Sequence, residues 1–219
     1  KPFFLYAPLS SPHLPVVVNQ EYRGKSQAGE YGDFVVETDA FVGAVLDTLD
    51  RTGLAENTLV LFTSDNGGFY KATTNAPLRA NKGAYYEGGI RVPLLIKWPG
   101  VTRPGGVISE PVTSTDLYPT CLAAAGLPRR PSQHLDGLNL QPVLAGAAAL
   151  GRRSLFWHFP HYNEHPSSVP SSVVRRGPWK LIETFDPEGV ELYNLADDLG
   201  ETNNLAAAKP GLVGDLRRE

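Results

Sequence analysis

The sequence predicts an α/β protein: a parallel or mixed sheet flanked by helices, followed by a small C-terminal antiparallel sheet with a helix. Two observations lead to this prediction. An apolar stretch, a long amphipathic helix and a second apolar stretch follow one another, which is the order of a strand–helix–strand unit. From about Gly151, short stretches separated by turn residues are typical of antiparallel strands. We therefore divide the chain into a larger α/β part, residues 1–150, and a small α+β part, residues 151–219.

The first apolar stretch, Phe3 to Ala7, has the length and bulk of a buried strand, and a proline-rich loop follows it. The helix comes next, and Gly53 stands where a left-handed C-terminal cap is expected. Its apolar face has the three-to-four spacing of Phe34, Val35, Thr38, Phe41, Val42, Val45, Leu46 and Leu49. Because the chain opens on a strand expected to be central, with no leader before it, we expect it to be a fragment of a longer protein.

The second apolar stretch, Leu59 to Thr63, ends abruptly in polar and glycine residues. A polar segment, residues 70–89, is too long for a simple connection and is expected to be a functional loop. The remaining expected elements are a strand at residues 92–98, a helix from Asp116 to Ala125, one or two helical turns at residues 140–144, strands at residues 155–159, 172–176, 179–184 and 190–195, and a last helix from Leu205 interrupted by Pro210 and Gly211.

Composition excludes several classes of function. The net charge of −3 gives no electrostatic case for binding nucleic acid or an anionic membrane surface, and no apolar run approaches the length of a membrane span. Cys121 is the only cysteine, so neither an intrachain disulfide nor a zinc–thiolate cluster can form. The oligomeric state is left open by the sequence.

Asp65 and Asn66 follow the second apolar strand directly, at the carboxyl end where chemistry gathers in such sheets. A carboxylate and an amide carbonyl offer hard oxygen ligands to calcium or magnesium, although two ligands are too few for calcium. Asp-Asn-Gly is also ideal for an ordinary tight turn, and the residues alone leave both interpretations open.

Two cationic candidates flank this turn in the sequence. His13 lies in a proline-rich loop, where an imidazole is either simply solvated or available to bind an anion or donate a proton. Lys82 is surrounded by small residues and glycines, which let the backbone approach a ligand, so its ammonium is a candidate for holding a sulfate or phosphate oxygen.

A histidine-rich stretch, residues 157–165, contains His158, His161 and His165. A zinc site is the less favoured interpretation, because Pro160 separates the first two histidines and no thiolate is available. A loop is the favoured interpretation.

The order of these motifs resembles the sulfatase family of the alkaline-phosphatase-like superfamily. The resemblance lies in Lys1-Pro2-Phe3-Phe4-Leu5-Tyr6 with Pro12-His13-Leu14-Pro15, in Asp65-Asn66, in Lys82 before Glu87-Gly88-Gly89-Ile90-Arg91-Val92-Pro93, and in Glu191-Leu192-Tyr193-Asn194-Leu195 followed by Asp198, Gly200, Glu201, Asn204 and Leu205. It spans nearly the whole chain and does not specify the substrate.

The resemblance implies a sulfuric ester hydrolase acting on a small-molecule or sugar sulfate, in a periplasmic, secreted or lysosomal location. Asp65 and Asn66 would be metal ligands to Ca²⁺ or Mg²⁺, and Lys82 and His13 would hold sulfate oxygens and help the leaving group depart. The histidine-rich loop would rim the substrate pocket, with His158 and His161 contacting the alcohol part of the substrate. The family's formylglycine nucleophile arises in a Cys/Ser-x-Pro-x-Arg motif, which is absent here. The isolated fragment is therefore expected to be inactive. Two alternatives stay open: a phosphate or phosphonate monoester hydrolase of the same superfamily, and a non-catalytic binding protein.

Overall fold

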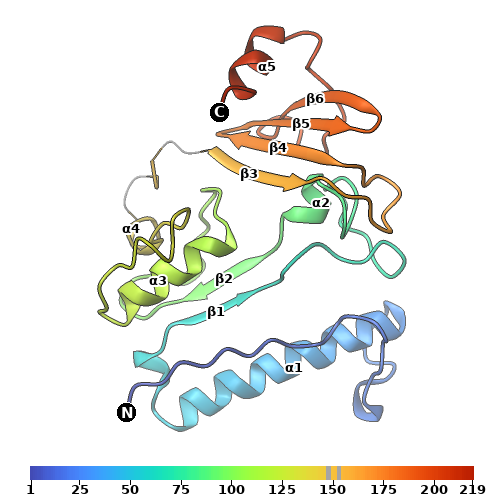
Figure 1. Ribbon diagram of the computed structural model, residues 1–219. Helices are drawn as coiled ribbons and strands as arrows, with labels where there is room; N and C mark the ends of the chain where they lie inside the picture. The colour runs from blue at the N-terminus through green and yellow to red at the C-terminus, as the bar shows by residue number, and fades with distance from the viewer. Residues whose placement is uncertain (147–148, 152–153) are drawn as a thin grey trace. The chain divides into compact units, whose positions relative to one another are not determined.

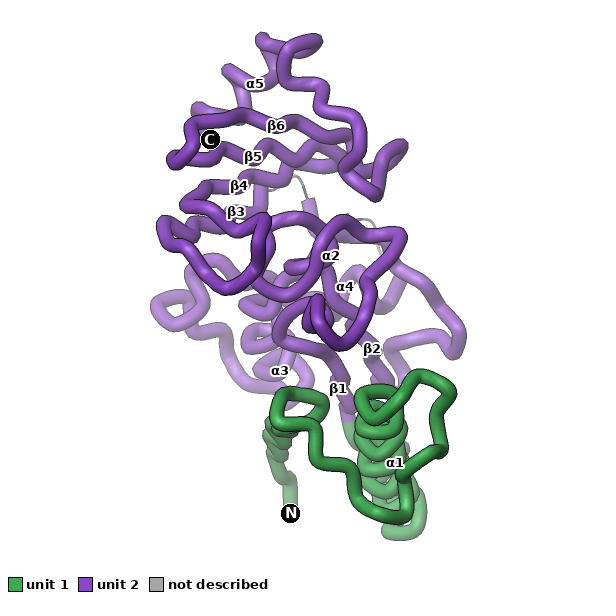
Figure 2. The backbone as a smooth tube through the Cα atoms, turned by 90° about the vertical axis from the view of Figure 1, so that its right-hand side faces the viewer, with its two compact units in different colours: residues 1–58 green, residues 59–219 purple. Residues whose placement is uncertain are grey.

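The computed structural model describes residues 1–146, 149–151 and 154–219. The chain forms two compact units, residues 1–58 and residues 59–219 (Figure 2), and each is described by itself. The junction expected near residue 150 lies beside residues 147, 148, 152 and 153, which are outside the described residues. In the described part of the chain, no helix has both the length and the apolar character needed to traverse a bilayer.

The first unit is built on one long helix, α1 (Gly29–Arg51), with short 3₁₀ turns at Gln20–Tyr22 and Ala55–Asn57 (Figure 1). The expected helix is thus confirmed. Gly53 has a φ of +69°, and its N–H donates to the Asp50 carbonyl, as expected for a C-terminal cap.

The expected strand at Phe3 to Ala7 is wrong. These residues form no strand, and Phe4 and Tyr6 are 79% and 77% exposed. A strand exists only where a neighbour takes up its N–H and C=O groups, and no described residue pairs with this segment. The apolar side chains of this segment are suited to burial, but the described residues leave them exposed.

The second unit begins with a hairpin-like pair, β1 (Val60–Thr63) and β2 (Leu94–Lys97). The two strands are antiparallel, with Thr63 opposite Leu94 and Val60 opposite Lys97. The parallel strand–helix–strand pairing expected from the sequence is therefore not formed among the described residues. Between the strands, the polar segment carries one short helix that the sequence did not predict, α2 (Glu87–Ile90).

Two further helices follow, α3 (Leu117–Ala124) after a 3₁₀ turn at Ser114–Asp116, and α4 (Gln141–Leu144). The Asp116 carboxylate is buried and accepts hydrogen bonds from the N–H groups of Thr113 and Leu138, both at 2.8 Å. Cys121 lies on α3, where burial raises the pKa of its thiol. Its side chain is partly buried.

The C-terminal strands form the expected antiparallel sheet, in the order β3 (Ser154–Phe159), β4 (Ser171–Arg176), β5 (Trp179–Phe185) and β6 (Glu188–Asn194). The last helix, α5 (Pro210–Leu216), begins at the proline that was expected to interrupt it. Proline suits the first helical turn because the N–H it lacks would have no partner there.

This four-stranded sheet separates two apolar cores. On one face Val173, Ile182 and Tyr193 pack with Tyr85 and Tyr86, next to α2. On the other face, the side chains that pack with α5 are Val174, Leu181, Leu192, Val213 and Leu216 (Figure 1). Alternate residues along each strand therefore belong to different cores.

Candidate active site

The turn after β1 and the segment around Lys82 are joined by backbone hydrogen bonds. The Lys82 N–H donates to the Gly68 carbonyl at 3.0 Å, and the Gly67 N–H donates to the Gly89 carbonyl at 3.0 Å. The Gly88 N–H in turn donates to the Arg79 carbonyl at 2.8 Å. These bonds hold the segments that carry Asp65, Asn66 and Lys82 against one another.

The Asn75 side chain and the absence of a side chain at Gly88 stabilise this junction. The Asn75 amide donates to the Gly88 carbonyl at 2.8 Å, and its Oδ1 accepts from the Gly68 N–H at 3.3 Å. A Cβ atom at Gly88 would lie 2.1 Å from the Ala80 carbonyl oxygen, so only glycine permits this approach. Asn75 could not be predicted from the sequence, because an asparagine in a polar loop has no distinguishing pattern.

The polar groups at the junction are available to bind a ligand. Within the described part of the chain, the side chains of Asp65 and Asn66 and the Lys82 ammonium make no hydrogen bond or ion pair with protein. Oxygen donors of this kind suit Ca²⁺ or Mg²⁺. The described residues contain no group of three or more His, Cys, Asp and Glu side chains placed to hold a metal ion, and metal binding by Asp65 and Asn66 stays a prediction.

A buried network of charges fixes α2 to the C-terminal sheet. The Lys180 ammonium on β5 is fully buried and lies 3.1 Å from Glu87 Oε1 and 2.8 Å from Glu201 Oε1. The Glu87 N–H donates to Glu201 Oε2 at 2.7 Å, while Arg175 and Arg91 each lie 3.7 Å from Glu87 Oε2. Removing Lys180 would leave two buried carboxylates without this partner, at a cost of about 3–5 kcal/mol.

Glu201 is held in an unusual backbone conformation, with a φ of +52°. Its carbonyl accepts a hydrogen bond from Arg79 Nη1 at 2.9 Å, and Arg79 also donates to the Tyr193 hydroxyl at 2.8 Å. Burial raises the pKa of the Glu201 carboxyl, and the Lys180 ammonium opposes that rise. Arg79 immediately precedes the Ala80–Lys82 segment, so this second set of contacts also anchors the Lys82 loop.

The loop between β3 and β4, residues 160–170, contacts the residue that follows Lys82. The Asn163 Nδ2 donates to the Gly83 carbonyl at 2.6 Å, and the His165 ring packs edge-on against Tyr70 with centroids 5.3 Å apart. This arrangement places the loop beside the Lys82 junction, and its position at the rim of a substrate pocket stays a prediction. Asn163 could not be predicted from the sequence, because its contact joins residues 80 positions apart.

The two histidines predicted to bind substrate lie in different places. His158 pairs across the sheet with Ser172, its Nδ1 lies 2.7 Å from the Ser172 hydroxyl, and its ring faces Phe185. Strand alternation puts Trp157 on the face that packs near α2, and His158 therefore on the α5 face. The structure does not bring His158 together with Lys82. His161 is exposed at the start of the loop, edge-on to Phe159.

His13 belongs to the first unit, where its loop contacts α1 through a hydrogen bond from Thr38 to the Ser11 hydroxyl. Its Nδ1 lies 2.8 Å from the Leu14 carbonyl. Because a carbonyl only accepts, Nδ1 carries the proton and Nε2 is the nitrogen with a lone pair. Its convergence with Lys82 stays a prediction.

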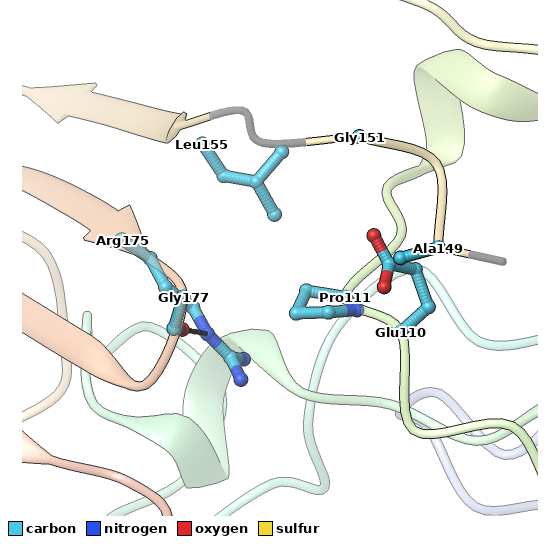
Figure 3. A pocket seen from close by; sticks show the side chains of 7 residues that line it. All are labelled: Glu110, Pro111, Ala149, Gly151, Leu155, Arg175 and Gly177. Atoms are coloured by element: carbon cyan, nitrogen blue, oxygen red, sulfur yellow. Dashed lines mark hydrogen bonds between the residues drawn. The ribbon is translucent and has the colours of Figure 1, made fainter.

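A pocket of about 280 Å³ lies elsewhere in the second unit (Figure 3). Its lining is mostly apolar and consists of Glu110, Pro111, Ala149, Gly151, Leu155, Arg175 and Gly177. The Arg175 Nε donates to the Gly177 carbonyl at 3.4 Å, as the dashed line in Figure 3 shows. None of the predicted site residues lines this pocket.

Comparison with known proteins identifies the family. The sequence profile of the sulfatase family matches residues 1–127, and the profile described as N-sulphoglucosamine sulphohydrolase, C-terminal, matches residues 80–212. The chain belongs to the sulfatase family. Similar curated sulfatases include one from Formosa agariphila, 39% identical over 95% of this chain and 43% of its own length, and human arylsulfatase A, 37% identical over 99% of this chain and 46% of its own length. The chain thus spans less than half the length of these sulfatases.

Solved structures confirm the expected α/β sulfatase fold. The structure described as Ps i-CgsB in complex with k-i-k-neocarrahexaose superimposes with a TM-score of 0.82 at 29% identity, covering 95% of this sulfatase chain and 47% of that chain. A phosphonate monoester hydrolase from Silicibacter pomeroyi superimposes less closely, with a TM-score of 0.63 at 26% identity over 86% of this chain and 38% of that chain. The likeness to a sugar-bound protein is therefore the stronger one.

Proposed function

We propose that the whole protein hydrolyses a sulfate ester to an alcohol and sulfate. The observation that carries this proposal is the junction in which Asp65, Asn66 and Lys82 lie on segments joined by backbone hydrogen bonds. An anion-binding ammonium beside hard oxygen ligands is the arrangement that a divalent cation and a tetrahedral oxyanion require together. Membership of the sulfatase family supports sulfate as that anion.

In this proposal, Asp65 and Asn66 hold a Ca²⁺ or Mg²⁺ ion through their side-chain oxygens. When bound, the cation would supply positive charge beside the sulfate oxygens, and a formylglycine elsewhere in the protein would supply the nucleophile. The Lys82 ammonium would donate hydrogen bonds to sulfate oxygens and hold the group in place while the electrons of the breaking S–O bond move onto the leaving alcohol oxygen. His13 donates its Nδ1 proton to the Leu14 carbonyl, so Nε2 can act as a donor only in the protonated imidazole, where it would bond a sulfate oxygen or deliver its proton to the leaving alcohol oxygen.

We further propose that the alcohol part of the substrate is a sugar. Two findings support this: the second profile match is to an N-sulphoglucosamine sulphohydrolase, and a structural neighbour is described with a bound neocarrahexaose. The β3–β4 loop would supply the contacts, with His161 and the exposed Tyr162 nearest in sequence to the Asn163–Gly83 hydrogen bond. The role of His158 stays a prediction, and strand alternation does not support it.

Mutation of the junction tests the function directly. In the whole protein, Lys82→Ala or Asp65→Ala is expected to lower sulfate release by about a hundredfold or more, by analogy with other positioned electrostatic groups. Lys97→Ala is the matched control, because Lys97 is exposed at the opposite end of the β1–β2 pair from Asp65. Near wild-type turnover in either junction variant would refute the assignment.

The alternative hydrolase is tested by supplying several esters to the wild-type protein. Sulfated sugars and an aryl sulfate should be hydrolysed faster than a phosphonate or phosphate monoester of the same alcohol. The opposite preference would establish the phosphonate hydrolase alternative, which its structural neighbour supports more weakly. Calcium binding without turnover of any ester would establish the non-catalytic alternative.

A further inference from the structure

Asn163 joins the two parts of the proposed substrate site. Its Nδ2 donates to the Gly83 carbonyl at 2.6 Å, and its Oδ1 accepts from the His165 N–H at 2.7 Å. The Asn163 amide therefore contacts the residue next to Lys82 through Nδ2 and stabilises the conformation of its own loop through Oδ1.

The backbone of Gly83 is shaped to receive this side chain. Gly83 has a φ of +94°, and a Cβ atom there would lie 2.9 Å from Asn163 Oδ1 and 3.1 Å from the His165 Cβ. A side chain at position 83 would thus be strained and would displace the loop. The Lys82 N–H is fixed to Gly68 on its other side, so Lys82 lies between two anchors, one from the turn after β1 and one from the β3–β4 loop.

The loop itself is secured by contacts on either side of Asn163. The Tyr162 hydroxyl donates to the Asp186 carboxylate in the turn between β5 and β6, and the buried His165 ring packs against Tyr70. Because the loop is held in place by these contacts, the Asn163–Gly83 hydrogen bond restrains the backbone of Gly83, the residue next to Lys82.

We infer that Asn163 is a positioning residue, which aligns the sulfate-binding Lys82 with the loop that contacts the alcohol part of the substrate. This inference rests on the proposed function. It assigns to Asn163 no contact with substrate: its effect passes through the backbone of Gly83.

Asn163→Asp tests the inference with a side chain of the same shape. The aspartate keeps an acceptor for the His165 N–H but cannot donate to the Gly83 carbonyl, and it places a carboxylate oxygen against that carbonyl. In the whole protein we expect KM for a sulfate ester to rise roughly three- to tenfold, the range that loss of one hydrogen bond gives, with a smaller change in kcat. Inhibition by inorganic sulfate, which needs Lys82 but not the alcohol contacts, should weaken in parallel.

Two further variants complete the experiment. Asn203→Asp adds the same charge at another exposed asparagine of the second unit and should leave KM and sulfate inhibition unchanged. Asn163→Gln retains a donor and should recover part of the affinity. If Asn163→Asp lowers only the thermal midpoint, or matches Asn203→Asp in every kinetic constant, the inference is wrong. Absence of sulfate release by the wild-type protein would instead refute the proposed function.

Discussion

At the residue scale, Asp33 shows how one carboxylate organises a loop. It lies in the first turns of α1, is buried, and accepts hydrogen bonds from the N–H groups of Gly24 and Ser26, each at 2.7 Å. The backbone hydrogen bonds, that of Ser26 first, hold the pKa of Asp33 below its ordinary value of 3.8. The ionised carboxylate is therefore part of the folded structure of this loop.

The pH dependence of this loop follows from the direction of that shift. Because folding lowers the pKa of Asp33, its ionised carboxylate stabilises the folded state at pH values above 3.8. This contribution is lost as the pH falls below that value. We expect amide exchange at Gly24 and Ser26 to quicken below that pH, after correction for intrinsic rates. Asp33→Asn should already show fast exchange at neutral pH, whereas Asp39→Asn, at an exposed position of the same helix, should not. Equal protection in wild type and Asp33→Asn at neutral pH would contradict this account.

At the element scale, the β3–β4 loop combines fixed contacts with a titratable group. His165 is buried against Tyr70, and its Nδ1 accepts a hydrogen bond from the Ser167 N–H at 3.1 Å. Burial lowers the pKa of His165 below its ordinary value of 6.5. Nδ1 can accept this hydrogen bond only when it carries no proton, and burial disfavours the charged imidazolium. The folded loop therefore requires the neutral imidazole.

Acidification should therefore loosen this loop. The unfolded loop binds a proton more readily than the folded one, so the loop's stability falls as the pH drops below 6.5. Hydrogen exchange at residues 160–170 should be faster at pH 5.5 than at pH 7.5, relative to β5, once intrinsic rates are removed. His165→Phe keeps the ring contact with Tyr70 but removes the titration, and should abolish this difference. A loop equally protected at both pH values in the wild type would show that the imidazole does not report on loop packing.

The elements also show what the sequence could and could not predict. Helix α1 and the four C-terminal strands were predicted within a few residues, because local periodicity and turn residues determine them. The strand at Phe3 to Ala7 was not, since a strand depends on a neighbour that local sequence does not specify. Asp65, Asn66 and Lys82 were predicted from motifs and their roles stay predictions, as does that of His158. Asn75 and Asn163 could not be predicted, because they act through contacts distant in sequence.

At the scale of the whole molecule, the chain spans 43% and 46% of the two curated sulfatases described above. Asp65 and Asn66 are only two of the ligands that the proposed metal ion needs, and no Cys/Ser-x-Pro-x-Arg motif occurs among the 219 residues. The proposed chemistry therefore requires groups from outside this stretch.

This leads to an expectation for the isolated 219-residue polypeptide. Supplied with Ca²⁺ and an aryl sulfate, it should release no sulfate above the uncatalysed rate, while the whole protein does so under the same conditions. Circular dichroism on the same sample is the control, because an unfolded polypeptide would be inactive for a trivial reason. Measurable hydrolysis by the folded isolated chain would show that the 219 residues contain a sufficient nucleophile.

The lysine that Glu87 and Glu201 share has an evolutionary consequence. The ammonium of Lys180 has two carboxylate neighbours within 3.1 Å, in a position fully shielded from water. A neutral residue at position 180 would leave two buried carboxylates without the cation that they share. Substitutions here should therefore be inherited as compensated sets, and an alignment of relatives should show the three positions covarying, with an apolar residue at 180 only where both acids are also lost.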